Sequence, residues 1–180
     1  NVGGDGTNGA QTGSVYCNPT NITTIGSGGG ANIQNSPSYR RGGLGGGLVR
    51  LVASNDFSIN GEITADADNA AVSTFNQFGG GAGGGAGGGV FLLGNTLSGN
   101  PVSISANGGD GAAPGNANVS SKAGGGGSGG CIYLGYVTSS TINTSTITAT
   151  KGLSIGIDPA QNNNDGSDGI ITIAQVNTQS

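Results

Sequence analysis

The residues able to do chemistry in this chain are few and scattered. None of the 180 residues is a histidine, which excludes acid–base catalysis and metal ligation by imidazole. Asp66 and Asp68 stand two positions apart, as two carboxylates on one strand face would, and such a pair could serve a glycosidase. The alternative is a pair of turn residues, and the absence of tryptophan as a sugar platform favours it. We therefore expect no enzymatic activity and no cofactor. The carboxylates are Asp5, Asp56, Glu62, Asp66, Asp68, Asp110, Asp158, Asp165 and Asp168.

Two loops place oxygen ligands next to glycine, GGDGTNG at residues 3–9 and NNNDGSD at residues 162–168. Calcium prefers such oxygens, which makes Asp165 and Asp168 weak candidates for a calcium site. Neither loop has the ligand spacing of an EF-hand. Ordinary turns of Asn, Asp and Gly have the same composition, so we expect no metal centre.

Cys17 and Cys131 are the two cysteines of the chain. One interpretation is a disulfide, which would close a loop of more than about 100 residues and stabilise the fold by about 4–5 kcal/mol on the chain-entropy model. The other is a pair of buried thiols. A disulfide, few charges and many Asn, Ser and Thr residues are together typical of proteins outside the cell.

Three sequons begin at Asn21, Asn118 and Asn143, and they are candidate glycosylation sites if the source organism glycosylates. Asn143 is expected inside a strand, where a glycan would need an exposed face. The same stretch has threonine at every second position from 144 to 150. Such a row is one way to bind ice, and the alternative is an ordinary solvent-facing strand.

Charge is scarce, at 8% of residues and a net charge of −4. This composition excludes a long charged tail, and five cations are too few for a nucleic-acid surface. The adjacent pair Arg40–Arg41 could bind an acidic loop of a neighbouring subunit or lie in a solvated loop. No stretch approaches the roughly 20 apolar residues of a membrane span. No signal peptide is recognisable, which fits either a processed product or a fragment.

The elements that must position these residues are short strands, each entered from a glycine run. The segments GLVRLV, GVFLLG, GCIYLG and GIITIA begin at Gly47, Gly89, Gly130 and Gly169, at steps of 42, 41 and 39 residues. A second series of apolar positions follows each of the first three strands, and Ile63, Ile104 and Ile147 belong to it. Alternation of polar and apolar residues indicates strands throughout, and no segment has helical periodicity.

Glycine accounts for 41 residues, in runs such as 79–89 and 124–130. These runs are either flexible linkers or extended polyproline-II-type segments that pack closely because they lack side chains. The spacing predicts one all-β domain over residues 1–180, built as a glycine-rich repeat array with units of about 40 residues. A β-solenoid and a sandwich of hairpins both fit. The expected units are 1–46, which is atypical, 47–88, 89–129, 130–168 and the partial unit 169–180.

Glycine runs that enter a short apolar strand, as in GGGVFLL, and segments such as VSISANGGDG and GSDGIITIA resemble the glycine-rich β-solenoid repeats of secreted and surface proteins. The glycine runs are also similar to the polyglycine-II segments of phage tail-fibre adhesins. The resemblance covers about residues 42–176 and transfers no site residue. It implies an extracellular fibre, an adhesin or a coat component.

We expect an extracellular structural subunit that assembles with copies of itself into a filament, a pilus-like fibre or a surface coat. The strand after Gly169 is nearly uncharged and terminal, and an open strand edge pairs readily with another chain. Its assembly candidates are Ile170, Ile171, Ile173 and Val176. The alternative is a receptor-binding adhesin, with glycans or a host receptor as partner and Tyr16, Tyr39, Tyr133 and Tyr136 as contact candidates. Ice binding ranks after it.

Overall fold

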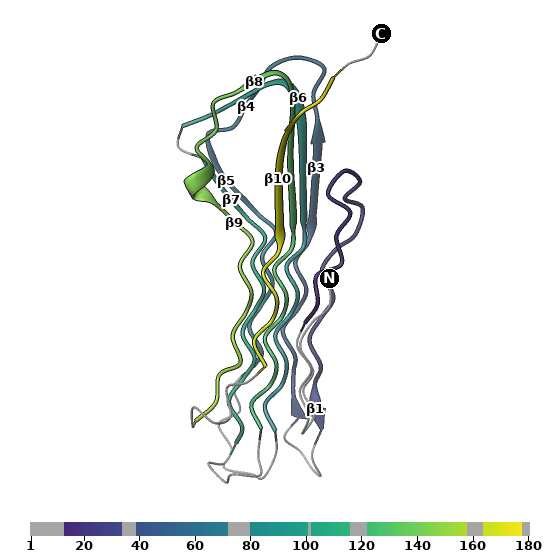
Figure 1. Cartoon of the computed structure of the whole chain (residues 1–180). Helices are drawn as coiled ribbons and strands as arrows, with labels where there is room; N and C mark the ends of the chain where they lie inside the picture. The colour runs from purple at the N-terminus through teal and green to yellow at the C-terminus, as the bar shows by residue number, and fades with distance from the viewer. Residues whose placement is uncertain are drawn as a thin grey trace.

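The computed structural model describes residues 13–33, 39–71, 80–100, 102–115, 122–157 and 164–177 (Figure 1). Nearly all regular structure in these ranges is strand, and one 3₁₀ turn is the helical element among them. The strands are β1 (Asn32–Ile33), β2 (Tyr39–Arg40), β3 (Leu48–Val52), β4 (Phe57–Ser58), β5 (Gly61–Thr64), β6 (Gly89–Ser98), β7 (Val102–Ser105), β8 (Cys131–Ser140), β9 (Ile147–Thr148) and β10 (Ile170–Gln175), and the turn is η1 (Thr144–Thr146).

Two parallel sheets form the upper half of the molecule (Figure 1). The large sheet has the order β10-β8-β6-β3, with β4 added beside the end of β6. The small sheet has the order β5-β7-β9. The chain passes from a strand of the large sheet to a strand of the small sheet and then leaves downward, so the two sheets run in opposite directions (Figure 1).

The main hydrophobic core lies between the two sheets. Val90, Leu92 and Leu134 of the large sheet and Ile104 of the small sheet are each 0% exposed. The four strands of the large sheet pair in register, with Leu48, Gly89, Cys131 and Ile170 side by side. In the small sheet, Ile63, Ile104 and Ile147 are paired in the same way. The spacing of about 40 residues therefore brings equivalent apolar side chains into continuous rows.

Extended segments without strand assignment, most of them rich in glycine, run below the sheets, and we call them together the glycine bundle (Figure 1). They comprise residues 26–30, 42–47, 65–71, 80–88, 106–112, 122–130, 149–154 and 164–169. Every residue from 80 to 88 is buried, and so is every residue from 123 to 130. Because a buried backbone must be hydrogen-bonded, these segments depend on bonds to their neighbours.

The central segment 80–88 hydrogen-bonds in more than the two directions available to a strand in a sheet. Its donors follow a period of three: Gly81, Gly84 and Gly87 donate to Lys122, Gly125 and Ser128 in turn. This is the repeat of a helix with three residues per turn, such as polyproline II, whereas a strand has a period of two. Backbone bonds join the segment to residues 27–30, 43–47, 65–68, 109–112 and 122–128.

The same hydrogen bond occurs at the junctions between the bundle and the strands β6, β8 and β10. Gly88, Gly130 and Gly169 each stand at the end of an ascending segment, and their N–H groups donate to the carbonyl oxygens of Ala65, Ala106 and Ala149 at 2.8, 2.6 and 2.6 Å. All three alanines are buried. These three hydrogen bonds therefore align the first residues of β6, β8 and β10 with one another.

The predicted repeat array, whether a β-solenoid or a sandwich of hairpins, is wrong. Neighbouring strands in both sheets are parallel, and hairpins join antiparallel strands only. The segments between the strands do not form the rungs of a solenoid either, because their hydrogen bonds leave the plane of any sheet. The structure is instead a domain of two parallel sheets continued by the glycine bundle.

Candidate functional site

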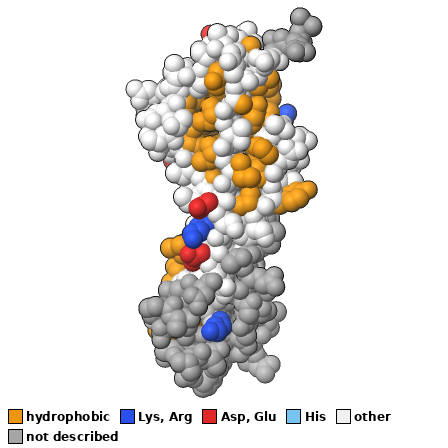
Figure 2. Space-filling view, viewed as in Figure 1, with side chains coloured by type: hydrophobic (Ala, Val, Ile, Leu, Met, Phe, Trp, Pro, Cys, Tyr) orange, Lys and Arg blue, Asp and Glu red, His pale blue; other side chains and the backbone are white. Residues whose placement is uncertain are grey.

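The two outer edges of the large sheet carry exposed aliphatic side chains. Among the described residues, β3 and β10 each pair with a strand on one side only. On β10, Ile170, Ile171 and Ile173 are 38, 42 and 37% exposed, against 0% for Leu134 in the neighbouring strand. On β3 the exposed aliphatic residues are Leu48, Leu51 and Val52. Figure 2 shows the hydrophobic surface of the β10 side, over the upper half of the molecule.

Three of the four predicted assembly residues therefore lie on an open edge, and the fourth does not. Val176 follows β10, is half-buried, and packs against the outer cluster of Phe91 and Tyr133. Its N–H donates to the carbonyl oxygen of Tyr136 at 2.7 Å. Val176 therefore ties the end of β10 to the sheet and is not part of the free surface.

The hydrogen bonds at the strand ends show which backbone groups of each edge are free to pair. Ile170 and Val176 donate to β8, so the even-numbered residues of β10 face β8. The odd-numbered residues Ile171, Ile173 and Gln175 therefore direct their N–H and C=O groups outward. On β3, Gly47 accepts from β6 and Ala53 donates to β6, so odd-numbered residues face inward. The outward set on β3 is Leu48, Arg50 and Val52.

Side chains of both edges continue rows that cross the large sheet. On the inner face, Leu51, Leu92, Leu134 and Ile173 form one row. A second row consists of Val49, Val90, Ile132 and Ile171. In both rows the middle members are fully buried, whereas Leu51, Ile171 and Ile173 at the ends are exposed. At each edge, the rows of core side chains therefore end in residues that have no neighbouring strand on the outer side among the described residues, and we call such rows unfinished rows.

The outer face of the large sheet carries a stack of aromatic rings. The rings of Phe91 and Tyr133 are stacked with centroids 5.0 Å apart, and the guanidinium carbon of Arg50 lies 4.0 Å from the Phe91 centroid. The disulfide between Cys17 and Cys131, with Cα atoms 5.8 Å apart, fixes the N-terminal segment over this face. The sequence analysis left Cys17 and Cys131 open as either a disulfide or two thiols, and it missed the Arg50–Phe91 contact.

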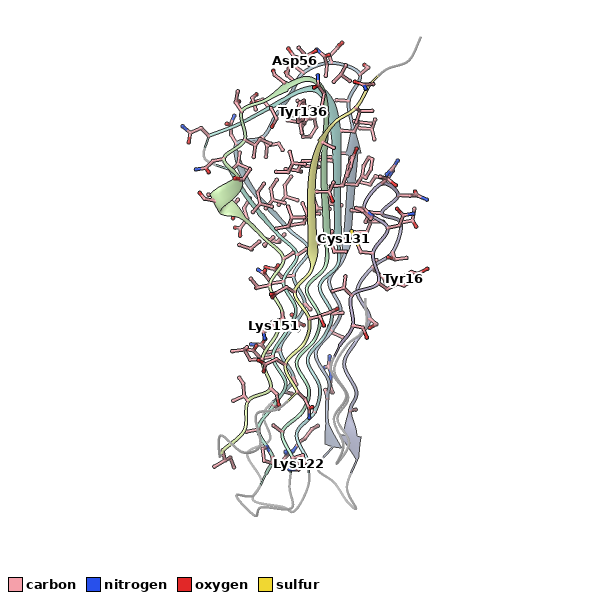
Figure 3. All side chains as sticks on the ribbon, viewed as in Figure 1. Tyr16, Asp56, Lys122, Cys131, Tyr136 and Lys151 are labelled. Carbon is pink, nitrogen blue, oxygen red and sulfur yellow. A yellow bond between two sulfur atoms is a disulfide. The ribbon has the colours of Figure 1, made fainter. Side chains whose placement is uncertain are left out.

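The four tyrosines proposed as adhesin contacts do not gather on one surface. Tyr16 is 73% exposed, whereas Tyr133 is 7% exposed and stacked on Phe91. Tyr136 packs against the main core, far from Tyr16 in the side-chain view (Figure 3). The side chain of Tyr39 lies outside the described residues.

Aspartate and asparagine side chains cross-link neighbouring segments of the glycine bundle. The Asp66 carboxylate accepts from the N–H of Asn107 at 2.6 Å, and the Asn107 side chain accepts from the N–H of Thr150 at 2.9 Å. The same pattern occurs three residues further along each segment. The Asn69 side chain accepts from the N–H of Asp110, and the Asp110 carboxylate accepts from the N–H of Leu153, both at 2.7 Å. The Asp66 carboxylate therefore binds the backbone of a neighbouring segment, and this arrangement gives no support to a catalytic acid pair with Asp68.

The two calcium candidates also act as cross-links. Asp165 accepts from the N–H of Ser154 at 2.9 Å and forms an ion pair with Lys151 at 3.2 Å, and Asp168 accepts from the N–H of Lys151 at 3.0 Å. The hydrogen bond from Ser154 and the charge of Lys151 lower the pKa of Asp165, although burial opposes them. No group of three or more metal-ligating side chains occurs within the described ranges.

Two of the three sequon asparagines are exposed, and Asn118 lies outside the described residues. Asn143 does not lie in a strand as predicted. It caps η1, and its side-chain oxygen accepts from the N–H of Ser145 at 3.0 Å. Because Thr144 and Thr146 belong to this 3₁₀ turn, the predicted row of threonines on one strand face is also wrong.

A buried arginine is a feature that the sequence analysis missed. Arg40 is 7% exposed, and its Nη1 donates to the carbonyl oxygens of Gly80 and Ala113 at 3.1 and 3.0 Å. Burial lowers its pKa from the ordinary value. Arg40 therefore joins two segments of the same chain, and the expectation that it binds a neighbouring subunit or solvent does not fit.

No helix within the described ranges is long and apolar enough to span a membrane. Comparisons with protein-family models, with curated proteins and with solved structures found no match to this chain. The open edges of the large sheet are therefore the candidate functional site on geometry alone.

Proposed function

We propose that the protein is an extracellular structural subunit that assembles with copies of itself into a filament or coat through the edges of the large sheet. The observation that carries the proposal is the pair of open edges, β3 and β10, both lined by exposed aliphatic side chains. An open, uncharged edge is a template for another strand, and monomeric proteins commonly block it with charge, proline or a bulge. Arg50 is the one charged residue of β3, and β10 has none.

Other features support a structural role outside the cell. The disulfide between Cys17 and Cys131 fits an oxidising compartment. The glycine bundle gives a rigid body that holds both edges in fixed positions, since its central segment is hydrogen-bonded on all sides. The low net charge of −4 allows copies to approach closely.

The alternative function, a receptor-binding adhesin, lacks a comparable observation. It would need an exposed aromatic or polar surface, and the three tyrosines whose side chains are described are divided between the hydrophobic clusters and the N-terminal segment. The edges β3 and β10 expose aliphatic side chains along a strand, which favours pairing with another strand over binding of a glycan.

Negative-stain electron microscopy of the purified protein over a dilution series tests the proposal. We expect uniform filaments or sheets that persist on dilution, and their loss in a variant with a charge on each edge, Ile173→Lys with Val52→Lys. Thr23→Lys with Thr144→Lys adds the same two charges at exposed positions outside both edges and is the matched control. Monomers at every wild-type concentration, or assembly that the edge variant retains, would overturn the proposal.

A further inference from the structure

We infer that the joint between copies is head-to-tail: β10 of one copy pairs in parallel with β3 of the next, with Ile170 beside Leu48. This inference rests on the proposed function and specifies its contact. The partner is a second copy of this chain, because the two edges match one another in backbone, side chains and charge.

The outward-facing N–H and C=O groups of the two edges can hydrogen-bond to one another in this register. In this register Ile171 lies beside Val49 of the next copy, and in a parallel ladder it bonds to the residues before and after its partner. Those residues are Leu48 and Arg50, which direct their free groups outward, as Ile171 does. A shift by one residue would place inward-facing groups in the joint and turn every side chain to the other face.

The same register completes the unfinished rows of the core. Ile173 comes to lie beside Leu51, and Ile171 beside Val49, so each row continues from one copy into the next. Three of the four end members, Leu51, Ile171 and Ile173, are about 40% exposed in the single chain, and strand neighbours about 5 Å away would cover them. The small sheet ends one strand earlier, so the large sheet carries the joint.

Charge disfavours one symmetric alternative, in which the β3 edges of two copies pair with each other. Two β3 edges paired antiparallel would bring Arg50 of one copy close to Arg50 of the other, and like charges across a strand pair are destabilising. The β10 edge has no charged residue, so Arg50 meets Thr172 instead in the head-to-tail joint. A head-to-tail contact also repeats without limit, whereas a symmetric pair closes as a dimer.

Single-edge variants test the direction of the joint. Proline at an outward-facing position removes a free N–H that the fold itself does not use, and edge strands tolerate it. Ile173→Pro blocks the β10 edge and Arg50→Pro blocks the β3 edge. Ile173→Lys and Val52→Lys are second variants of the same edges in case proline prevents folding, which thermal melting would reveal. Light scattering after gel filtration then gives the mass of each species.

We expect each single-edge variant alone to be a monomer of about 17.1 kDa and an equimolar mixture of the two to give a dimer of twice that mass and nothing larger. A dimer formed by either variant alone would show symmetric pairing and overturn the inference, while the proposed function would stand. Monomeric wild-type protein, or filaments from a single-edge variant, would overturn both.

Discussion

The glycine bundle predicts that adding a single methyl group at Gly84 destabilises the protein strongly. Gly84 lies in the middle of the central segment, and its N–H donates to the carbonyl oxygen of Gly125 at 2.9 Å. A Cβ atom there would lie less than 3.0 Å from the carbonyl group of Gly109 and 2.8 Å from the carbonyl carbon of Asp110. These atoms belong to the backbone of a neighbouring segment, so no flexible side chain can move aside.

The expected loss of stability has two contributions, overpacking and weakened backbone hydrogen bonds. The two segments must separate until the methyl group fits, and overpacking of a rigid interior costs about 1–3 kcal/mol. Separation also weakens the bonds between segment 80–88 and residues 109–112, where Gly109 and Ala112 donate at 2.9 Å. Each backbone bond contributes about 1 kcal/mol net. We therefore expect Gly84→Ala to cost about 3–5 kcal/mol, which for a chain of this size lowers the Tm by about 10 °C or more.

Gly47→Ala is the matched control, because a Cβ atom at Gly47 has no atom within 4 Å. Replacing a glycine where there is room stabilises a protein by about 0.4–1 kcal/mol through the unfolded state. Thermal and denaturant unfolding followed by circular dichroism would measure both variants. If Gly84→Ala melts within about 2 °C of the wild type while Gly47→Ala behaves as expected, close packing of the segments does not stabilise this fold.

Three further predictions concern single contacts. Reduction of the Cys17–Cys131 disulfide should lower the free energy of unfolding by up to about 4–5 kcal/mol on the chain-entropy model, measured by denaturant titration with and without reductant; an unchanged midpoint would contradict it. The folded pKa of Asp165 is lowered, so its contacts stabilise the fold above the unfolded pKa of about 3.9 and are lost as pH falls through the folded pKa. The Tm difference between the wild type and Asp165→Asn should therefore exist at pH 7 and close below about pH 4; a constant difference would refute this. Arg40→Met should cost about 3 kcal/mol, since it removes two hydrogen bonds from a charged donor, and a loss below about 1 kcal/mol in denaturant unfolding would show that solvent replaces the guanidinium.

The positions of the main strands could be predicted from the sequence, because their signal is local. The strands β3, β6, β8 and β10 each begin at or directly after a glycine, and their first four residues are mainly aliphatic or aromatic. The path between the strands could not be predicted. A spacing of about 40 residues fits a solenoid, a hairpin sandwich and the observed parallel sheets equally.

The contacts that hold the bundle together were missed for a different reason. Asp66 and Asn107 are 41 positions apart, and in the sequence each has the composition of an ordinary turn. The sequence analysis assigned Arg40 to a binding surface or to solvent because nothing local shows that its guanidinium is buried between two carbonyl oxygens. Similarly, the threonines of η1 alternate as a strand would, but the Asn143 cap bends the chain into a 3₁₀ turn.

The glycine bundle and the open edges are physically connected. Glycine-rich sheets specify register weakly, and a strand that slips by one residue exposes its apolar face. Here the segments that lead into β6, β8 and β10 are hydrogen-bonded before the strand begins, because Gly88, Gly130 and Gly169 donate to buried alanines at equivalent positions. The bond at Gly169 fixes the height of β10, although β10 has a neighbour on one side only. Ile171 and Ile173 are therefore already held, in the single chain, in the register that the inferred pairing with β3 of another copy would require. Preorganisation of this kind reduces the entropy lost on association, so a joint of only five residue pairs can be specific.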